Sequence, residues 1–411
     1  MRNTAPSLPV AVIGAGPIGL SAAAHLLNRG YTPIIFEAGA QAGTHLAHWG
    51  HVRMFSPWSY NIDPAAAELL KKDGWLEPDL THFPTGNELL EHYVIPLATH
   101  SNIAPHLQLN SRVQHVSRRN HDVLRSKGRD NTPFVLRIAG PDGEHDITAQ
   151  AVIDASGTYQ TPNWLGTHGI PALGENAAAH AISYGVPDIL GSARAHYTNR
   201  SVLVVGAGHS AFNALQDLVR LAEQSTDMRV HWAVRSESVT NVVRSPANDE
   251  LQERRELEVH IQELLEQGRI DVHTGIEIDA ITQNQNGVTV HSNGQQLPPV
   301  DRIIAATGFR PDLSLLSELR TTIDPATQSP SRLAPLIDPN LHSCGSVPEH
   351  GAAELSHPEP NLYTVGIKSY GRAPTFLLRT GYKQVLSVIR ALDSEEELTP
   401  VQPCPAPTCQ G

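Results

Sequence analysis

The fold is decided by one stretch near the amino terminus, Val10–Glu37, which reads VAVIGAGPIGLSAAAHLLNRGYTPIIFE. A short apolar segment, Val10–Ile13, predicts a buried strand, and an alanine-rich segment, Ser21–Asn28, predicts a helix. A second apolar segment, Pro33–Glu37, predicts another strand and ends in an acid. A strand, a glycine-rich turn, a helix and a strand in this order predict a βαβ unit with parallel strands.

The turn inside this stretch has the spacing GxGxxG, which is typical of dinucleotide binding. Gly14 allows the tight turn, Gly16 lets the backbone approach a pyrophosphate, and Gly19 lets the helix pack closely on the strand. The helix N-terminus offers free N–H groups to the phosphates. Glu37 can accept hydrogen bonds from a ribose diol. The expected contacts of this first site are Gly14, Gly16, Pro17, Ile18, Gly19 and Glu37.

The same order of elements returns in the second half of the chain. A strand over Ser201–Val205 leads to the sequence GAGHSA at Gly206–Ala211, then a helix through Leu221 and a strand over Arg229–Val234. An alanine replaces the third glycine and is small enough for the same helix–strand contact. The expected contacts of this second site are Gly206, Gly208, His209, Ser210, Ala211 and Arg235.

The residue after the second strand distinguishes the two sites. Arg235 stands where the first unit has Glu37. An acid there would repel a 2′-phosphate, whereas an arginine can pair with it in a charge-assisted contact. The sequence therefore favours NADPH over NADH at the second site. The alternative is that Arg235 is only a solvated charge at the end of a strand.

Each half of the chain closes on a related ending, Ala151–Gly157 (AVIDASG) and Asp301–Gly308 (DRIIAATG). Small residues at a strand end let the chain pass close to a bound dinucleotide. Two such units predict one site for a tightly held cofactor and one for an exchanging partner. The expected contacts from these endings are Ala155, Gly157, Thr307 and Gly308.

With these motifs in this order, the chain resembles the two-dinucleotide-binding flavoproteins, most closely the bacterial relatives of flavin-containing monooxygenases. The resemblance runs from about residue 8 to 392. It implies an α/β fold of two Rossmann-like, three-layer domains, in which an NADPH-binding domain is inserted into an FAD-binding domain. It also implies the domain bounds: FAD domain 8–165 and 335–392, NADPH domain 166–334, and a flexible Pro- and Cys-containing tail, 393–411.

The resemblance also implies where the chain returns to the flavin. Phe83–Tyr93 resembles the family's proline-led helix beside the flavin, and Pro360–Gly366 resembles the returning strand with its glycine, Gly366. Lys368 and Tyr370 follow at once and are expected near the ring. A cation at the pyrimidine end of the ring would stabilise reduced flavin. A surface loop charge is the alternative for Lys368.

The loop 45–61, HLAHWGHVRMFSPWSYN, raises the question of a metal because His45, His48 and His51 are three apart. No carboxylate or cysteine stands nearby to complete a zinc set, so no metal is expected. The resemblance places this loop over the flavin, and ordinary loop packing is the alternative. The expected pocket residues are Trp49, Arg53, Phe55, Trp58 and Tyr60, of which Arg53 and Trp58, with Lys368 and Tyr370, are candidates for catalysis.

Two departures from the family bear on function. The monooxygenase pattern F-x-G-x-x-x-H ahead of the second fingerprint is absent, and the chain reads ILGSARAHY at Ile189–Tyr197. The only cysteines are Cys344, Cys404 and Cys409, so neither dinucleotide unit holds a redox pair. Cys344 is expected to be a small core residue. Cys404 and Cys409 are either part of a disordered tail or a mobile redox pair.

The composition limits the partners. The chain has 411 residues, 40% of them hydrophobic and 18% charged, which is typical of a globular protein. A formal net charge of -12 argues against nucleic-acid binding. There is no signal-peptide pattern and no apolar run long enough to span a bilayer, so a cytoplasmic protein without membrane partners is expected. A homodimer is left open.

Together these features predict an FAD- and NADPH-dependent oxidoreductase. The leading hypothesis is a monooxygenase that uses molecular oxygen and a peroxyflavin to oxygenate a small substrate with a soft nucleophile, namely a sulfur, nitrogen or metalloid centre. One alternative is a reductase or oxidase that passes electrons to a small acceptor or a partner protein. The other is a flavoprotein that senses NADPH or redox state without turnover.

Overall fold

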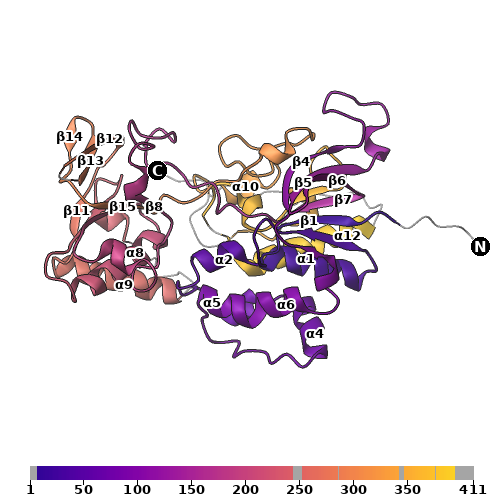
Figure 1. The fold of residues 1–411 in the computed structure, drawn as a ribbon, viewed down its shortest axis with the longest axis horizontal. Helices are drawn as coiled ribbons and strands as arrows, with labels where there is room; N and C mark the ends of the chain where they lie inside the picture. Colours follow the sequence, from indigo (N-terminus) through magenta and orange to yellow (C-terminus); the bar gives the residue numbers. More distant parts are fainter. Residues whose placement is uncertain (1–6, 244–251, 286, 342–346, 375, 394–411) are drawn as a thin grey trace, which may run out of the picture. The chain divides into compact units, whose positions relative to one another are not determined.

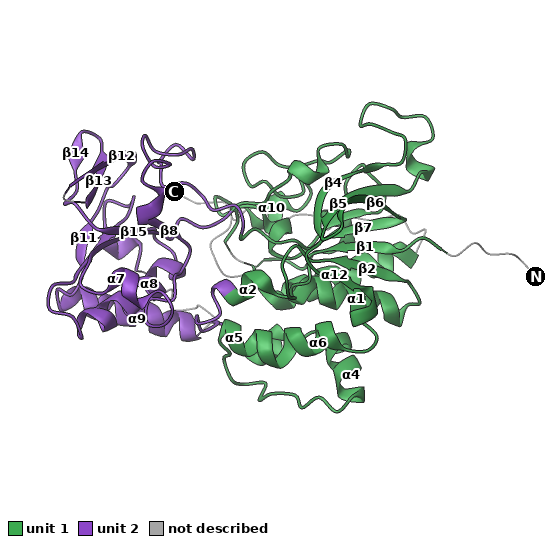
Figure 2. Cartoon of the chain, in the orientation of Figure 1, with its two compact units in different colours: residues 1–47, 56–159, 310–411 green, residues 48–55, 160–309 purple. Residues whose placement is uncertain are grey.

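A computed structural model of the chain describes residues 7–243, 252–285, 287–341, 347–374 and 376–393. By contact the chain divides into two units (Figure 2). Residues 1–47, 56–159 and 310–411 form unit 1, and residues 48–55 and 160–309 form unit 2.

Unit 1 is built on a five-stranded parallel sheet in the order β16-β7-β1-β2-β3. Its strands β7 and β1 are labelled in Figure 1. The opening stretch supplies β1 (Val10–Ile13), α1 (Pro17–Asn28) and β2 (Pro33–Phe36), as its pattern predicts. The helix begins at Pro17, earlier than the predicted Ser21. Proline suits the first turn because its missing N–H has no partner there in any case.

The two faces of this sheet are covered differently, which gives three layers. On one face α1 packs against α12 (Leu378–Asp393). On the other face, Ala11 and Ile13 contact the buried side chains of a three-stranded antiparallel sheet, β4-β5-β6. The remaining elements of unit 1 are α2 (Thr44–His48, which ends in unit 2), α3 (Trp58–Asn61), α4 (Pro64–Lys72), α5 (Gly86–Leu89), η1 (Leu90–Val94), α6 (Ile95–Thr99), η2 (Ala104–His106), β3 (Leu107–Gln108), β4 (Arg112–Arg118), η3 (Arg129–Asn131), β5 (Phe134–Gly140), β6 (Gly143–Ala149), β7 (Ala151–Asp154), η6 (Ser314–Leu316), α10 (Ala334–Ile337), α11 (Ala352–Leu355), β16 (Leu362–Thr364) and η7 (Gly366–Tyr370).

Unit 2 repeats this plan with the sheet β11-β10-β9-β15-β8, whose pairings are all parallel. Val202 and Val204 face one core, shared with helices α8 and α9, while Leu203 faces another, shared with the sheet β12-β13-β14. The elements of unit 2 are η4 (Ala179–Ala181), β8 (Ile182–Tyr184), α7 (Arg194–Tyr197), β9 (Ser201–Val205), α8 (His209–Ala222), β10 (Arg229–Ala233), η5 (Val239–Asn241), α9 (Gln252–Glu266), β11 (Asp271–His273), β12 (Ile278–Asn284), β13 (Gly287–Ser292), β14 (Gln295–Gln296) and β15 (Arg302–Ala305).

The predicted α/β fold with two dinucleotide-binding units, the second inserted in the first, is confirmed. The chain enters unit 2 at Gln160 and leaves it at Phe309. The domain bounds at 165/166 and 334/335, which assign residues to the FAD-binding or the NADPH-binding domain, stay a prediction. Within the described ranges, no helix combines the length and the apolar character that a bilayer crossing requires.

Candidate functional site

The first glycine fingerprint forms a turn between β1 and α1 that only glycines can make. Gly14 has a φ of +98°, and a Cβ there would lie 2.8 Å from the carbonyl oxygen of Ala155. A Cβ at Gly19 would collide with the carbonyl oxygen of Gly14, so the helix can approach the strand only without a side chain. At Gly16, by contrast, a Cβ would meet nothing within 4 Å. The open space at Gly16 leaves room for a ligand against the backbone.

The N-terminus of α1 is the natural place for a pyrophosphate beside this turn. Gly16 is its N-cap residue, and in the described part of the chain no side chain caps the helix. The N–H groups of the first turn and the positive end of the helix dipole are therefore available to an anion. The backbone of this segment fits the pyrophosphate of a dinucleotide.

Glu37 sits at the carboxyl end of β2, buried and held by the backbone. Its Oε2 accepts a hydrogen bond from Ala15 N at 2.9 Å, and its Oε1 accepts one from Gly39 N at 2.8 Å. A carboxylate has about four acceptor positions, so capacity remains for the two hydroxyls of a ribose. The geometry fits the role predicted for Glu37 at an FAD adenosine.

The predicted return of the chain brings a buried charge pair to the same sheet. The Nζ atom of Lys368 lies 2.7 Å from Oδ2 of Asp154 and donates to Oγ of Ser156 at 2.9 Å. Ser156 Oγ donates in turn to Oδ1 of Asp154 at 2.7 Å. We call these three residues the Lys368 cluster. The sequence singled out Lys368 but not its two partners.

The loops around the cluster pack against each other and against the start of α1. A Cβ at Gly157 would lie 3.8 Å from Ile367, and one at Gly366 would lie 3.3 Å from Ile18 at the start of α1. Thr364, the last residue of β16, pairs in register with Asp154. Its Oγ1 is buried and has no hydrogen-bond partner among the described residues. Three segments therefore meet at the carboxyl ends of neighbouring parallel strands. They are the Gly14–Gly19 fingerprint after β1, the Asp154–Gly157 segment at the end of β7 and the Gly366–Lys368 segment after β16.

Tyr370, expected near the ring, is fully buried in unit 1. Its ring lies 5.7 Å from that of His350 and 5.3 Å from that of Phe376, measured between centroids. Burial raises the pKa of Tyr370 above its usual value. Its expected place near the flavin ring stays a prediction.

The second fingerprint repeats the geometry of the first in unit 2. Gly206 has a φ of +139°, and a Cβ there would collide with the carbonyl oxygen of Ala306. Gly208 is open, as Gly16 is, and it is the N-cap residue of α8. The ring nitrogen Nε1 of the buried Trp232 donates to the carbonyl oxygen of Gly206 at 2.8 Å and fixes the turn. The predicted contacts His209, Ser210 and Ala211 form the first turn of α8.

Arg235 and the connecting segments complete the second site. Arg235 follows the strand β10 and is exposed, and no hydrogen bond or ion pair is found for it within the described ranges. Its guanidinium is therefore available to a phosphate. Thr307 Oγ1 donates to the carbonyl oxygen of Asn163 at 2.5 Å, and Asn163 Nδ2 donates to that of Thr307 at 3.0 Å. These bonds join the two segments by which the chain enters and leaves unit 2.

The aromatic loop 45–61 is divided between the units. Trp49, Arg53 and Phe55 lie in unit 2, and Trp58 and Tyr60 lie in unit 1. Phe55 packs on the core of unit 2, with its ring 5.1 Å from that of His209. The five residues stay predicted pocket residues.

On the unit 1 side, Trp58 is buried as the first residue of α3, and Tyr60 lies 3.9 Å below the guanidinium of Arg379. The rings of His45 and Tyr159 lie 5.7 Å apart, measured between centroids, and are tilted by 30°. A search of the described residues finds no group of three or more side chains that could hold a metal ion. Cys344, Cys404 and Cys409 lie outside the described residues.

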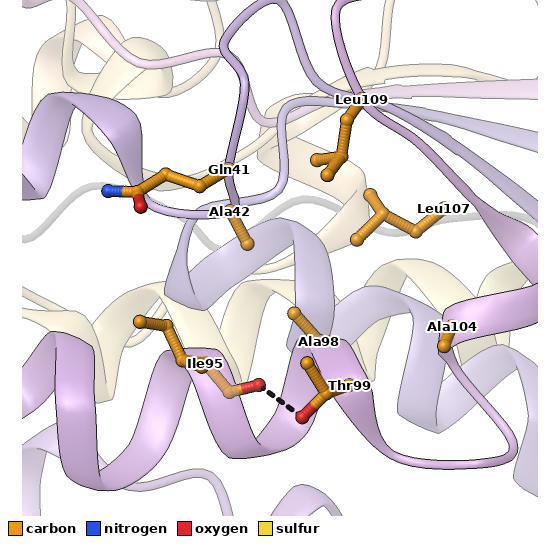
Figure 3. A pocket seen from close by; sticks show the side chains of 8 residues that line it. All are labelled: Gln41, Ala42, Ile95, Ala98, Thr99, Ala104, Leu107 and Leu109. Atoms are coloured by element: carbon orange, nitrogen blue, oxygen red, sulfur yellow. Dashed lines mark hydrogen bonds between the residues drawn. The ribbon is translucent and has the colours of Figure 1, made fainter.

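Unit 1 contains an apolar pocket that we did not predict from the sequence (Figure 3). It has a volume of about 510 Å³ and lies beside the edge strand β3, with the helix α6 on its other side. Leu107 and Leu109, two apart on and after β3, and Ile95 and Ala98, three apart on α6, show the alternation that would have indicated it. Its lining comprises Gln41, Ala42, Ile95, Ala98, Thr99, Ala104, Leu107 and Leu109.

Comparison with known proteins places these sites in a family. Residues 11–334 match the family described as pyridine nucleotide-disulphide oxidoreductase. A ferredoxin–NADP reductase of Salinispora tropica is 28% identical over 315 residues, which are 77% of this chain and 78% of that protein. The flavin-containing monooxygenase ustF1 of Aspergillus flavus is 27% identical over 226 residues, 51% of this chain and 50% of that protein.

Solved structures show the same fold. The bacillithiol disulfide reductase Bdr from Bacillus cereus has a TM-score of 0.68 at 20% identity, covering 95% of this chain and 100% of that one. A flavin-containing monooxygenase from Stenotrophomonas maltophilia has a TM-score of 0.59 at 21% identity, covering 94% and 98%. With two dinucleotide folds and this family match, the chain belongs to the pyridine nucleotide-disulphide oxidoreductases and is an FAD-dependent oxidoreductase that uses NADPH.

Proposed function

We propose that the protein is an NADPH-dependent monooxygenase that inserts one oxygen atom into a small substrate at a sulfur, nitrogen or metalloid centre. The observation that carries this proposal is the distribution of cysteines. Residues 1–343 contain none, so neither glycine fingerprint is followed by a Cys-x-x-Cys pair that could relay electrons to a disulfide. Electrons that reach the flavin then have oxygen or a diffusible acceptor as their outlet. Flavin-containing monooxygenases among the relatives support the first of these.

In this proposal each unit binds one cofactor. In unit 2, Gly208 and the first turn of α8 would bind the pyrophosphate of NADPH, and Arg235 would bind its 2′-phosphate. In unit 1, the Gly14–Gly19 turn and Glu37 would bind FAD, which supplies the redox chemistry with oxygen. The balanced reaction is substrate, NADPH, one proton and O₂ giving oxygenated substrate, NADP⁺ and water. No side-chain nucleophile is needed.

A reductase is the second candidate, because two relatives that this chain matches over three quarters of its length are named reductases. They are the ferredoxin–NADP reductase already described and the bacilliredoxin reductase Bdr of Bacillus subtilis, 23% identical over 78% of this chain. In that case electrons pass to a small acceptor or a partner protein. A net charge of -12 disfavours a strongly acidic partner, because like charges slow association.

Turnover under labelled oxygen tests the proposal. The purified holoprotein is mixed with NADPH, ¹⁸O₂ and a panel of thioethers, amines and arsenite, and the products are analysed by mass spectrometry. A monooxygenase incorporates one ¹⁸O atom per NADPH consumed. Absence of labelled product under ¹⁸O₂ would contradict oxygenation. If NADPH oxidation also continues without oxygen when a quinone is added, the reductase is favoured. Reduction of the flavin without any turnover would favour a sensor.

A further inference from the structure

The Lys368 cluster is a charged group deep in the protein, where stability alone does not explain it. Lys368 is 1% exposed and Asp154 is 0% exposed. Removing two charges from water costs about as much as their attraction returns, so a buried ion pair is seldom more stable than apolar side chains of similar size. Buried charges concentrate instead at functional sites, where they set the electrostatics of a reaction.

The strand order places this cluster opposite the ribose site. In the sheet β16-β7-β1-β2-β3, Glu37 lies at the end of β2, on one side of β1. Asp154 ends β7, and Lys368 follows β16, both on the other side of β1. A dinucleotide that begins at Glu37 and crosses the N-terminus of α1 with its pyrophosphate must end on the side of the cluster. In FAD the group at that end is the flavin ring.

The ammonium group of Lys368 is held by two partners, which leaves one of its N–H donors for a ligand. It donates to Ser156 Oγ and pairs with Asp154, which are two partners for its three N–H donors. Among the described residues no third partner is found for it. Asp154 is itself fixed, because Oδ1 accepts from both the backbone N, at 3.1 Å, and Oγ of Ser156.

We propose that Lys368 is a cation that favours the reduced state of the flavin ring, and that Asp154 and Ser156 are positioning residues that hold its ammonium group. The inference rests on the proposed placement of FAD in unit 1. Uptake of two electrons with one proton leaves one negative charge on the ring, which a nearby cation stabilises in a site of low dielectric. The cluster thereby raises the two-electron midpoint potential of the bound flavin.

Potentiometry of the holoprotein tests this. The midpoint potential is measured with a chemical reductant and a reference dye, without NADPH or oxygen. Lys368→Met is expected to lower the potential by at least about 30 mV, which corresponds to a tenfold change in the reduction equilibrium. Lys368→Arg keeps the charge and should stay closer to the wild type. The matched control is Lys383→Met, a lysine exposed on α12 of the same unit.

The positioning role has its own readout. Asp154→Asn leaves the ammonium without its counter-ion and should raise the potential at acidic pH, opposite in sign to Lys368→Met. If Lys368→Met does not retain FAD, the double variant Lys368→Met/Asp154→Asn removes both charges, and its potential should lie below that of Asp154→Asn. A Lys368→Met potential equal to that of Lys383→Met, or a double variant equal to Asp154→Asn, would overturn the inference. Neither measurement depends on whether the protein oxygenates a substrate.

Discussion

The side chain of Gln384 holds the backbone of Gly366, which begins the loop that returns to the FAD unit. Gly366 N donates to Oε1 of Gln384 at 2.8 Å, although the two residues are 18 positions apart. The amide nitrogen of Gln384 donates to Ser369 Oγ and to the ring of His350, both at 3.0 Å. Ser369 Oγ closes the circuit by donating to the carbonyl oxygen of Gly366 at 2.7 Å. Helix α12 thus fixes the conformation of η7 through one fully buried amide.

Gln384→Leu should therefore weaken FAD binding without touching FAD. The substitution keeps the volume but leaves Gly366 N without its acceptor and removes the hydrogen bond that Ser369 Oγ accepts. A buried unsatisfied donor costs about 1–3 kcal/mol. We expect the dissociation constant of FAD, measured by titrating the apoprotein and following flavin fluorescence, to rise about tenfold. Lys383→Leu, one position earlier and exposed, is the control. Equal affinity for FAD in both variants would show that the hydrogen bonds of Gln384 do not contribute to FAD binding.

Arg235→Ala should reduce the preference for NADPH. A hydrogen-bonded contact between a guanidinium and a phosphate is worth about 1.5–3 kcal/mol, so the KM for NADPH should rise at least tenfold while the KM for NADH changes little. Steady-state reduction of a dye with each coenzyme measures both. Arg229→Ala supplies the control, since Arg229 is exposed at the opposite end of β10. A parallel loss for NADPH and NADH would remove Arg235 from the 2′-phosphate site.

The parts of the site that follow one another along the chain were predictable. The strands, the glycine turns and the exposed arginine after β10 all depend on local patterns, and the structure places them as the sequence indicates. Even there, the start of α1 at Pro17 differed, because a proline at the first helical position reads in sequence as a turn residue.

The partners brought together by distant segments were not predictable from one sequence. Ser156 and Lys368 are 212 residues apart, and nothing in either segment indicates the other. The same holds for residues 48–55, which stand between two parts of unit 1 in sequence and yet belong by contact to unit 2. Such pairings depend on the packing of the whole chain, and local periodicity carries no information on it.

Glu359→Ala should destabilise unit 1 strongly. The Glu359 carboxylate is buried and accepts from Arg118 Nε at 2.8 Å, from Arg129 Nη2 at 2.8 Å and from Arg320 N at 3.0 Å. Its removal leaves two buried guanidinium groups without their anion, for which a loss of about 3–5 kcal/mol is expected. Urea unfolding followed by far-UV circular dichroism measures it. Asp146→Ala removes a partner of an exposed pair, with Arg137, and should change little.

His357 should make the protein less stable in mild acid. Its imidazole is buried, and burial lowers its pKa from 6.5 to about 4. Its Nδ1 accepts a hydrogen bond from Thr322 N at 3.4 Å. Between these values the unfolded chain binds a proton that the native state does not. The contribution of His357 to the free energy of unfolding is therefore fully present above about pH 6.5 and is lost as the pH drops toward 4. The full difference amounts to about 3 kcal/mol.

The contribution of His357 is isolated by comparing pH profiles of stability. In His357→Asn the amide oxygen can still accept from Thr322 N, but the side chain cannot bind a proton, so the fall between pH 6.5 and 4 should become shallower than in the wild type. His115→Asn, at an exposed position on β4, is the control and should keep the wild-type slope. Urea midpoints at half-unit pH steps give both profiles. If His357→Asn loses stability by the same amount at every pH, its effect is one of packing, and the acid sensitivity must come from other buried groups such as His350, whose pKa is also lowered by burial.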